Sequence, residues 1–410
     1  MSETLLDLGK LYVSDFLTDP AKEYTDRELA PLTLVMDENI GAPRLTQVVD
    51  PDKMYGTYWY RSGTNASMTN QLRNIAEEAS SRVKYEKGDV WLDIACNDGT
   101  MFNFIPEEFV KIGIDPVEDS FLEFSSQLAD VVIQDFFSYE AYQRTGHGDK
   151  KCKIITTIAM FYDLDDPTDF IEDIKKILHD DGIWVVQLSY TPLMVKQMAF
   201  DNICHEHVYY HSLNSMKKLM DAHGLKIVDC ALNDTNGGSC RVYIQKGEAR
   251  ETSFATKPLR DVCDFRIKTI LAYENEHADI SDPAMWVEFE RKLEAMKTQT
   301  VDFIRAEVAK GKTVYGYGAS TKGNTLLQYY GLTPDDIVAI AERSPQKFGK
   351  YVVGTNIPIV SEKEMRASNP DYLLVLPWHF IKEFVERESD FLNAGGKFIV
   401  PCPEFEIIGK

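Results

Sequence analysis

One eleven-residue stretch, residues 201–211, is dense in side chains that bind or transfer protons. It holds His205, His207 and His211, three of the eight histidines of the chain, and Glu206 lies between the first two. Imidazoles titrate near neutral pH, and a positioned imidazole can remove a proton as a general base. We predict that His207 is a catalytic base and that Glu206 either orients an imidazole or binds a substrate hydroxyl.

Other residues of this stretch leave two chemical alternatives open. Tyr209 or Tyr210 could donate a hydrogen bond to an oxyanion that forms when a proton leaves carbon, and we predict Tyr209 as the third catalytic residue. Alternatively, two imidazoles on one side of a strand could bind a metal, with His211 or Cys204 as a further ligand. The sequence has no second ligand-dense segment, and the metalloprotease signature spaces its histidines at i and i+4 on a helix. We therefore expect no metal.

A glycine turn typical of nucleoside-binding proteins follows a strand predicted over residues 89–94. It contains Asp93, Asn97 and Gly99, and Asp115 ends the next predicted strand. An acid at that position can accept hydrogen bonds from two ribose hydroxyls, and a glycine lets the backbone approach a ligand closely. The turn does not match G-x-G-x-x-G, which disfavours pyrophosphate, whereas S-adenosylmethionine (SAM) carries no phosphate. We predict SAM as the cofactor, bound by these four residues; the alternative is that the acids only shape the turn.

Two aromatic positions extend the predicted SAM site. Asp135 and Phe136 follow a third strand, predicted over residues 131–133. The carboxylate could accept the exocyclic amine of adenine while the phenyl ring packs on the adenine face, although Phe136 could equally belong to a core. Tyr60, in an aromatic run over residues 55–61, is assigned to the same site.

A second glycine turn, residues 316–324, lies in the last quarter of the chain. It resembles a dinucleotide loop, but its glycine spacing is wrong for one. It is also not a Walker A motif, because its lysine precedes the last glycine. A helix that starts here could present amides, hydroxyls and one ammonium group to a phosphate, or the turn could be purely structural. We predict that Lys322 and Asn324, with Arg343 and Lys347 after the following strand, bind a nucleotide substrate.

Strands that alternate with helices must position these residues. Besides those above, strands are predicted over residues 153–157, 183–188, 225–228, 240–244, 313–317, 337–340, 372–376 and 397–400. This alternation predicts the α/β class, with a Rossmann-like SAM-binding domain and a second, doubly wound C-terminal α/β domain after a small mixed N-terminal segment. The expected divisions are 1–67 for the N-terminal segment, 68–250 for the SAM-binding domain, 251–309 for a helical connector and 310–410 for a sugar-nucleotide-binding domain.

Composition excludes several classes of function. The net charge of −21 over 410 residues argues against a nucleic-acid surface, which needs clustered Lys and Arg. The sequence shows no apolar run long enough to span a bilayer and no basic-then-apolar leader at its start. The seven cysteines are odd in number and never form a CxxC, as expected for reduced thiols. We expect a cytoplasmic monomer or homodimer with a small-molecule substrate, no membrane and no nucleic acid.

Six motifs in order resemble the nucleotide-sugar C-methyltransferases, from about residue 55 to the C-terminus. They lie at residues 92–100, 201–207, 236–242, 316–327, 354–359 and 395–401. The resemblance implies a SAM-dependent enzyme that methylates a ring carbon of a nucleotide-linked 4-keto-hexose. A base would remove a proton beside the ketone, and the enolate would attack the methyl group. The resemblance also implies that the middle domain binds the donor and that the C-terminal domain holds part of the sugar nucleotide. Cys204, Tyr210 and Asn236 join the predicted substrate-binding residues.

The sequence departs from this family at three places. Family members usually begin with a zinc-binding module with cysteine pairs, but the first cysteine here is Cys96, so we expect no zinc. The family commonly has a tyrosine where Cys204 stands and a histidine where Asp163 stands. The substrate can therefore differ, and two alternatives remain: an O-methyltransferase on a sugar or polyol, and a non-catalytic nucleotide-sugar-binding protein. An NAD-linked oxidoreductase is disfavoured by the spacing of the second glycine turn.

Overall fold

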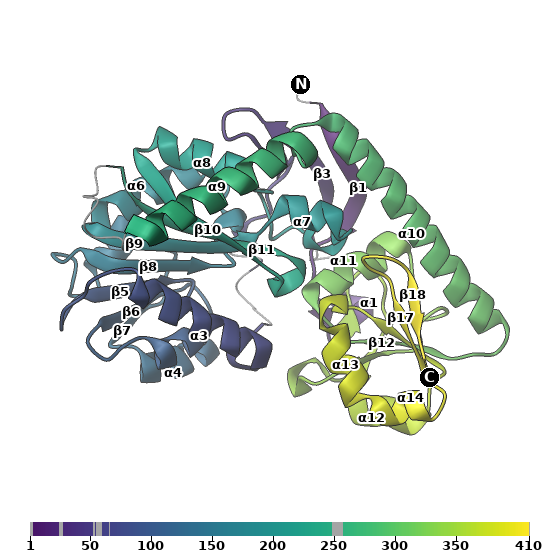
Figure 1. The fold of residues 1–410 in the computed structure, drawn as a ribbon. Coiled ribbons are helices and arrows are strands. Elements are labelled where there is room, and N and C mark those ends of the chain that lie inside the picture. Colours follow the sequence, from purple (N-terminus) through teal and green to yellow (C-terminus); the bar gives the residue numbers. More distant parts are fainter. Residues whose placement is uncertain are drawn as a thin grey trace.

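Three larger β-sheets and one two-stranded sheet organise the described part of the chain (Figure 1). The computed structural model describes residues 3–23, 28–51, 54, 60–64, 66–247 and 257–409. Strands are found in the N-terminal part as well, where the sequence indicated only a mixed segment. No helix in the described ranges is both long enough and apolar enough to cross a membrane.

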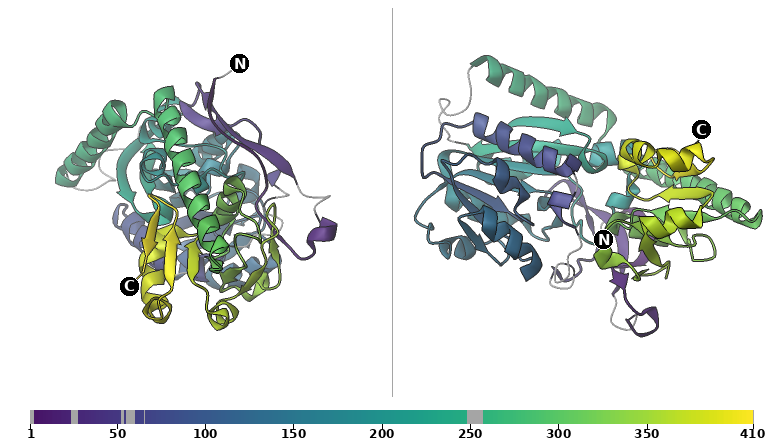
Figure 2. Two further views of the ribbon diagram at one scale, coloured as in Figure 1. Left: turned by 90° about the vertical axis from the view of Figure 1, so that its right-hand side faces the viewer. Right: turned by 90° about the horizontal axis from the view of Figure 1, so that it is seen from below.

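The N-terminal sheet is antiparallel, in the order β1-β3-β4. Its strands are β1 (Thr4–Tyr12), β3 (Leu29–Asp37) and β4 (Ala42–Leu45). Between β1 and β3, the short strand β2 (Phe16–Leu17) and helix α1 (Pro20–Glu23) turn the chain. Strand β2 pairs with β14 (Tyr351–Val352), which belongs to the last quarter of the sequence. Figure 2 shows these purple strands against the rest of the chain.

The central sheet has seven strands in the order β10-β11-β9-β8-β5-β6-β7. The strands from β9 to β7 run parallel, and β11 is antiparallel to both of its neighbours. The bounds are β5 (Val90–Ile94), β6 (Val110–Ile114), β7 (Val131–Ile133), β8 (Cys152–Ile158), β9 (Leu178–Ser189), β10 (Leu225–Asn233) and β11 (Ser239–Lys246). Each predicted strand of this domain overlaps one of these. The central strands carry continuous apolar runs because helices cover both faces of the sheet.

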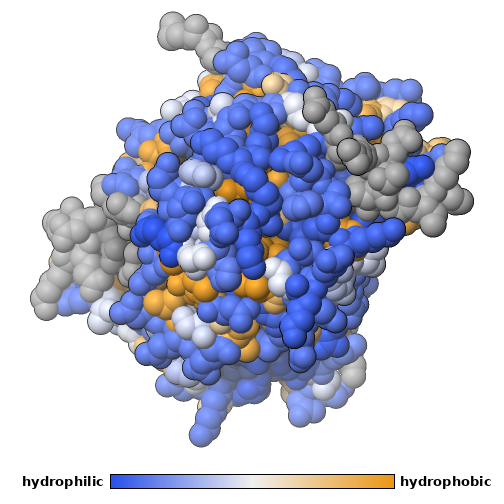
Figure 3. Space-filling model, turned by 90° about the vertical axis from the view of Figure 1, so that its left-hand side faces the viewer, coloured by the Kyte–Doolittle hydropathy of each residue, from blue (hydrophilic) through white to orange (hydrophobic). Residues whose placement is uncertain are grey.

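Helices α3 and α4 cover one face of the central sheet, and α6 and α8 cover the other (Figure 1). The helix bounds are α3 (Ala66–Ser81), α4 (Asp119–Leu128), α5 (Tyr139–Gln143), α6 (Pro167–Ile177), α7 (Thr191–Lys196) and α8 (Leu213–Ala222). Trp91 packs in the α3 core and Trp184 in the α6 core, and both are fully buried. The face in Figure 3 is mostly hydrophilic, with an apolar patch near its centre.

Two helices connect the central sheet to the C-terminal sheet. Helix α9 (Lys257–His277) packs against β10, and α10 (Pro283–Ala309) runs along the edge of the molecule (Figure 1). They separate where Asp282 caps α10 by accepting a hydrogen bond from Ala284 N, with a proline at the first helical position. The sequence indicated one continuous helical region here, and the structure divides it at this cap.

The C-terminal sheet has six strands in the order β15-β13-β12-β16-β17-β18, all parallel except the last. Its strands are β12 (Val314–Tyr317), β13 (Ile340–Glu342), β15 (Ile359–Ser361), β16 (Tyr372–Val375), β17 (Lys397–Val400) and β18 (Glu406–Ile408). Its helices are α11 (Thr321–Tyr330), α12 (Glu362–Ser368), α13 (Ile381–Arg387) and α14 (Ser389–Asn393). Strand β13 begins where the predicted strand 337–340 ends.

Each parallel sheet has one point at which the strand order reverses direction. In the central sheet this point lies between β5 and β8, and in the C-terminal sheet between β12 and β16. Ligands of open α/β sheets bind outside the carboxyl ends of the strands at such points. Loops at both points line the same cavity, which lies at the junction of the two domains.

Candidate active site

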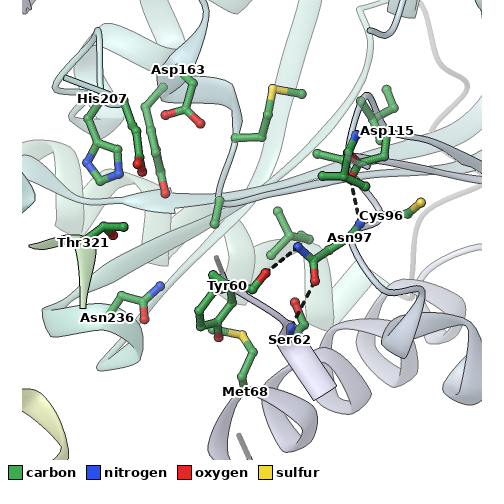
Figure 4. Close-up of a pocket in the computed structure, with 18 of the residues that line it drawn as sticks. Tyr60, Ser62, Met68, Cys96, Asn97, Asp115, Asp163, His207, Asn236 and Thr321 are labelled. Atoms are coloured by element: carbon green, nitrogen blue, oxygen red, sulfur yellow. Dashed lines mark hydrogen bonds between the residues drawn. The ribbon is translucent and has the colours of Figure 1, made fainter. Parts of the chain in front are cut away.

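One cavity of about 410 Å³ occupies this junction. The loops that follow β5, β6 and β8 line it from the central domain, and the loops after β12 and β16 line it from the C-terminal domain. Figure 4 shows Asp115, Asn97 and Ser62 toward one side and His207, Asp163 and Thr321 toward the other. A small molecule bound here would contact both domains.

Asp115 lines the cavity at the start of the loop after β6 and is held by two backbone amides. Its Oδ2 accepts a hydrogen bond from Asn97 N at 2.7 Å and its Oδ1 accepts one from Val117 N at 3.0 Å. Burial raises the pKa of Asp115, and these two amide bonds lower it. Each carboxylate oxygen can accept a further hydrogen bond. The carboxylate therefore fixes the loop after β5 and remains able to bind hydroxyl groups in the cavity.

Asn97 and Asp98 join the N-terminal segment to the same loop. Asn97 Oδ1 accepts from Ser62 N at 3.1 Å and its Nδ2 donates to Tyr60 O at 3.0 Å (Figure 4). Asp98 Oδ2 accepts from Gly63 N at 2.9 Å. Tyr60 and Asn97 both line the cavity, as the sequence prediction requires. Residues 55–59 of the predicted aromatic run lie outside the described residues.

Gly99 serves packing rather than ligand approach. A Cβ atom there would come within 2.7 Å of Ser125 Cα on α4, and its φ of +74° favours glycine. Gly99 is not among the residues that line the cavity. Asp93 does line it, and its Oδ1 accepts a hydrogen bond from Thr156 Oγ1 at 2.6 Å, while burial raises its pKa to about 7.

The structure separates the predicted adenine-binding pair. Phe136 lines the cavity with 44% of its surface exposed, so its ring is available to pack on a flat ligand. The Asp135 carboxylate instead forms an ion pair with Arg144 and accepts a hydrogen bond from Phe136 N, and it does not line the cavity. The structure therefore does not place Asp135 where the sequence suggested.

The end of the 201–211 stretch is held in place by the N-terminal sheet and by the loop after β8. Leu45 N, at the end of β4, donates to Val208 O, and Tyr210 N donates to Pro43 O, both at 2.9 Å. From the other side, Val208 N and Tyr209 N both donate to Tyr162 O at 2.9 Å. Although this segment has no strand of its own, these four bonds fix its backbone.

His207 is buried, and its tautomer follows from one hydrogen bond. Nδ1 lies 2.7 Å from the Asn202 carbonyl oxygen, which can only accept, so Nδ1 carries the proton and Nε2 has a free lone pair. Its ring centroid lies 4.3 Å from that of Tyr162. Burial, and the nearby Lys322 ammonium, lower the pKa of His207 to about 3. The imidazole is therefore neutral at physiological pH and available as a base.

Glu206, Asp201 and Lys322 form a charged cluster beside His207. All three line the cavity. Burial raises the pKa of Glu206 to about 6, and Lys322 opposes the shift. Burial also raises the pKa of Asp201, whose Oδ2 accepts from Trp378 Nε1 at 3.1 Å. Lys322 Nζ donates to Asn202 Oδ1 at 2.5 Å. The cluster joins side chains from both domains.

The other predicted cations of the C-terminal domain lie away from the cavity. Lys347 Nζ donates to Ala319 O at 2.7 Å and lies over the Phe16 ring, so it is buried under the N-terminal segment. Asn324 donates to Asp15 O at 3.2 Å and is also buried. Arg343 is exposed and does not line the cavity. Of the four predicted nucleotide contacts, the structure brings only Lys322 to the site.

The side chains of Tyr209, Tyr210 and Cys204, which were predicted to contact the substrate, point away from the cavity. Tyr209 Oη donates to Asp37 Oδ2 at 2.9 Å, and Tyr210 packs in the core that extends into the C-terminal domain. Cys204 is buried, and burial raises its pKa well above the usual value. None of the three lines the cavity. Asn236 does, because its loop packs on the C-terminal domain: a Cβ on Gly237 would lie 3.3 Å from Trp378.

Sequence reasoning missed several lining residues. His379, in the loop after β16, faces the cavity, and burial lowers its pKa to about 3. Met68, Leu72 and Tyr162 line the cavity too. The only available signal for His379 was its position just after a predicted parallel strand.

Metal binding finds no support in the geometry of the histidines. His205 Nε2 lies 3.0 Å from the Ala30 carbonyl oxygen, whereas His207 uses the Asn202 carbonyl. His211 is buried between Phe161 and Tyr209. Across the described ranges, no three His, Cys, Asp or Glu residues are grouped so as to hold a metal ion.

Comparison with known proteins assigns the class of enzyme. A family model described as a methyltransferase domain matches residues 66–229, and one described as the C-methyltransferase C-terminal domain matches residues 234–403. The chain is a SAM-dependent methyltransferase. The predicted fold class and the predicted cofactor are thereby confirmed. The second model supports carbon as the atom that this methyltransferase modifies.

The relatives of this methyltransferase include one curated C-methyltransferase. NovU, from Streptomyces niveus, is 29% identical over 382 residues, which are 93% of this chain and 88% of NovU. Similar solved structures include the plantazolicin methyltransferase BpumL, with 11% identity, TM-score 0.34, and coverage of 43% of this chain and 82% of BpumL. The N-methyltransferase NodS from Bradyrhizobium japonicum is 14% identical with a TM-score of 0.32, covering 44% and 96% of the two chains.

Proposed function

We propose that this methyltransferase acts on a ring carbon next to the keto group of a nucleotide-linked sugar. The observation that carries the proposal is a neutral, buried imidazole, His207, in the same cavity as the buried acid Asp115, to which we assign the ribose of the donor. A hydrogen on carbon beside a ketone is weakly acidic, so its removal requires a positioned base in a water-poor site.

His207 has the protonation state that this step requires. Its Nδ1–H is held by the Asn202 carbonyl, which leaves Nε2 to accept the proton from carbon. After transfer the ring is an imidazolium, and the Asn202 carbonyl, which accepts from Nδ1, stabilises it. When bound, SAM supplies a methyl group on a positively charged sulfur that accepts the electron pair of the carbanion. We assign Asp93, Asn97, Asp115, Phe136 and Tyr60 to its binding.

The position of the cavity supports an extended substrate. A sugar beside His207 would lie next to Asn236 and the loops after β12 and β16, which leaves a nucleotide to extend toward the C-terminal domain. The similarity to NovU, a C-methyltransferase, supports carbon as the acceptor.

We also propose the domain limits 1–67, 68–250, 251–309 and 310–410, since the three larger sheets lie within residues 4–45, 90–246 and 314–408.

Hydrogen exchange tests the proposal directly. A panel of nucleotide-linked keto sugars is incubated with the enzyme in deuterium oxide without SAM, and deuterium at the carbon beside the ketone is measured by mass spectrometry and NMR. We expect exchange with at least one sugar, and methylation at the same carbon when SAM is added. His207→Gln should abolish both, while His277→Gln, a change at an exposed histidine of α9, should leave both unchanged.

Two results would count against the proposal. Methylation of a hydroxyl without any carbon exchange would indicate an O-methyltransferase. Neither exchange nor methylation across the panel, in a preparation that binds S-adenosylhomocysteine (SAH), would exclude a keto sugar as substrate.

A further inference from the structure

Removal of a proton beside a ketone places negative charge on the keto oxygen, and that oxygen needs a partner. The sequence suggested Tyr209 or Tyr210 for this role, but neither side chain lines the cavity. The loop after β12 brings a different donor, Lys322, to the cavity beside His207. It is the second residue of α11, whose N-terminus begins at that loop.

The Lys322 ammonium is only partly satisfied within the protein. It has three N–H donors, and among the described residues its hydrogen-bond partner is Asn202 Oδ1. No carboxylate in the described part of the chain lies within 4.0 Å of Nζ to form an ion pair. Burial lowers the pKa of Lys322, which the nearby Asp201 and Glu206 oppose. Two N–H groups thus remain for a ligand in the cavity.

Asn202 holds the ammonium group and the base together. Its side-chain oxygen accepts from Lys322, and its main-chain oxygen accepts from His207 Nδ1 at 2.7 Å. A single buried residue therefore fixes the position of a hydrogen-bond donor relative to that of a base. Such a pairing is what an enolising site requires, because the proton and the developing charge lie on atoms two bonds apart.

The surrounding charges favour an enolate oxygen over a phosphate as the partner. The carboxyl groups of Asp201 and Glu206 both lie close enough to Lys322 to raise the pKa of its ammonium group. A diphosphate brought to this point would add two negative charges beside these carboxylates. An enolate oxygen brings at most one, and only as the reaction proceeds, so stabilisation is confined to the transition state and the intermediate.

We propose that Lys322 is a catalytic residue whose ammonium group donates to the keto oxygen and stabilises the enolate formed by His207. The inference rests on the proposed function. The carbon–hydrogen bond breaks, its proton goes to His207 Nε2, and its electron pair moves into the enolate, whose oxygen accepts from Lys322. The carbon then forms a bond to the methyl group as the bond between methyl and sulfur breaks. The keto group returns, SAH leaves, and His207 releases its proton to solvent.

The test compares Lys322→Met with Lys292→Met, which removes an exposed lysine of α10. For each variant the rate of hydrogen–deuterium exchange is measured without SAM as a function of keto-sugar concentration, and SAH affinity is measured as a check of the folded site. We expect the saturating exchange rate of Lys322→Met to fall roughly 10²- to 10³-fold, the usual effect of removing one oxyanion donor. The KM for the sugar and the SAH affinity should change less than about threefold, and Lys292→Met should match wild type.

A second variant covers the case in which Lys322→Met does not fold. Asn202→Ala keeps Lys322 but removes the only hydrogen-bond acceptor that positions its ammonium group among the described residues. The exchange rate at saturating sugar should therefore fall, while the KM stays close to that of wild type. Lys322→Arg should recover part of the exchange rate, since arginine keeps the positive charge but places it on a longer, planar group.

The outcomes separate this inference from the function on which it rests. A raised KM with an unchanged saturating rate in Lys322→Met would make Lys322 a phosphate contact and overturn the inference. Unchanged values of both parameters would overturn it as well. If wild type itself shows no exchange and no methylation, the proposed function fails first.

Discussion

Replacement of Asp115 by Asn should weaken donor binding more than its small change in shape suggests. Its two oxygens each accept a backbone hydrogen bond, from Asn97 N at 2.7 Å and from Val117 N at 3.0 Å. An amide offers only one oxygen, so its NH₂ group must face one of these N–H donors or turn away from it. Either arrangement disturbs the loop and removes a charged acceptor for a ribose hydroxyl.

The magnitude follows from the loss of one charge-assisted hydrogen bond. Such a bond contributes about 1.5 to 3 kcal/mol, so SAH should bind roughly 10- to 150-fold more weakly to Asp115→Asn. Isothermal titration calorimetry with SAH measures this without any knowledge of the methyl acceptor.

Glu342→Gln is a matched control in the second domain. Glu342 ends β13 as Asp115 follows β6, and it accepts from Ala319 N at 2.9 Å and from Ser344 N at 2.9 Å. Because Glu342 does not line the cavity, its variant should bind SAH within twofold of wild type. Equal affinity of Asp115→Asn and wild type, or an equal loss in both variants, would refute the assignment of Asp115 to the ribose.

Three further predictions concern charge and packing. The pKa of Glu206 is about 6, so the rate of hydrogen–deuterium exchange should decline as the pH falls through 6 and Glu206 becomes protonated. Glu206→Gln should exchange more slowly than wild type and show no such decline. A decline that persists in the variant would assign the titration to another group. Gly99→Ala should lower the free energy of unfolding by about 2 to 3 kcal/mol, because a Cβ would meet Ser125 Cα at 2.7 Å, and chemical denaturation checks this. Buried His211 has a pKa of about 3, against 6.5 when unfolded, so the unfolded chain binds more protons between these values and stability falls as pH falls. Relative to His211→Gln, the free energy of unfolding of wild type should fall by about 1.4 kcal/mol per pH unit below 6.5. Parallel plots of unfolding free energy against pH for the two proteins would contradict the lowered pKa of His211.

The sequence predicted the elements that local pattern determines. The strands before Asn97 and before Lys322 were found because short apolar runs precede glycine turns, and both residues line the cavity. His207 was selected because proton-transfer groups cluster around it. The N-terminal sheet was not predicted, since β1 alternates only partly and other elements separate it from its partner β3 in the sequence.

The direction of individual side chains was beyond local pattern. Tyr209 and Tyr210 adjoin the base in sequence, yet the pairing of this segment with β4 directs one to Asp37 and the other into the core. Lys347 was predicted as a phosphate contact, but the Phe16 ring of the N-terminal segment covers it. His379 belongs to a loop that meets the site only when the two domains are docked. In each case a partner more than a hundred residues away decides the outcome.

The hydrogen bond from Lys322 to Asn202 crosses from one domain to the other, and this has a consequence for how the enzyme is assembled. The half of the chain that recognises the donor would be able to hold it before the other half has docked, but without a poised electrophile beside the base. A nascent, nicked or partly unfolded molecule would then sequester SAM without consuming it. Under the proposed mechanism, the hydrogen-bond donor and the base come together only when the two domains are docked.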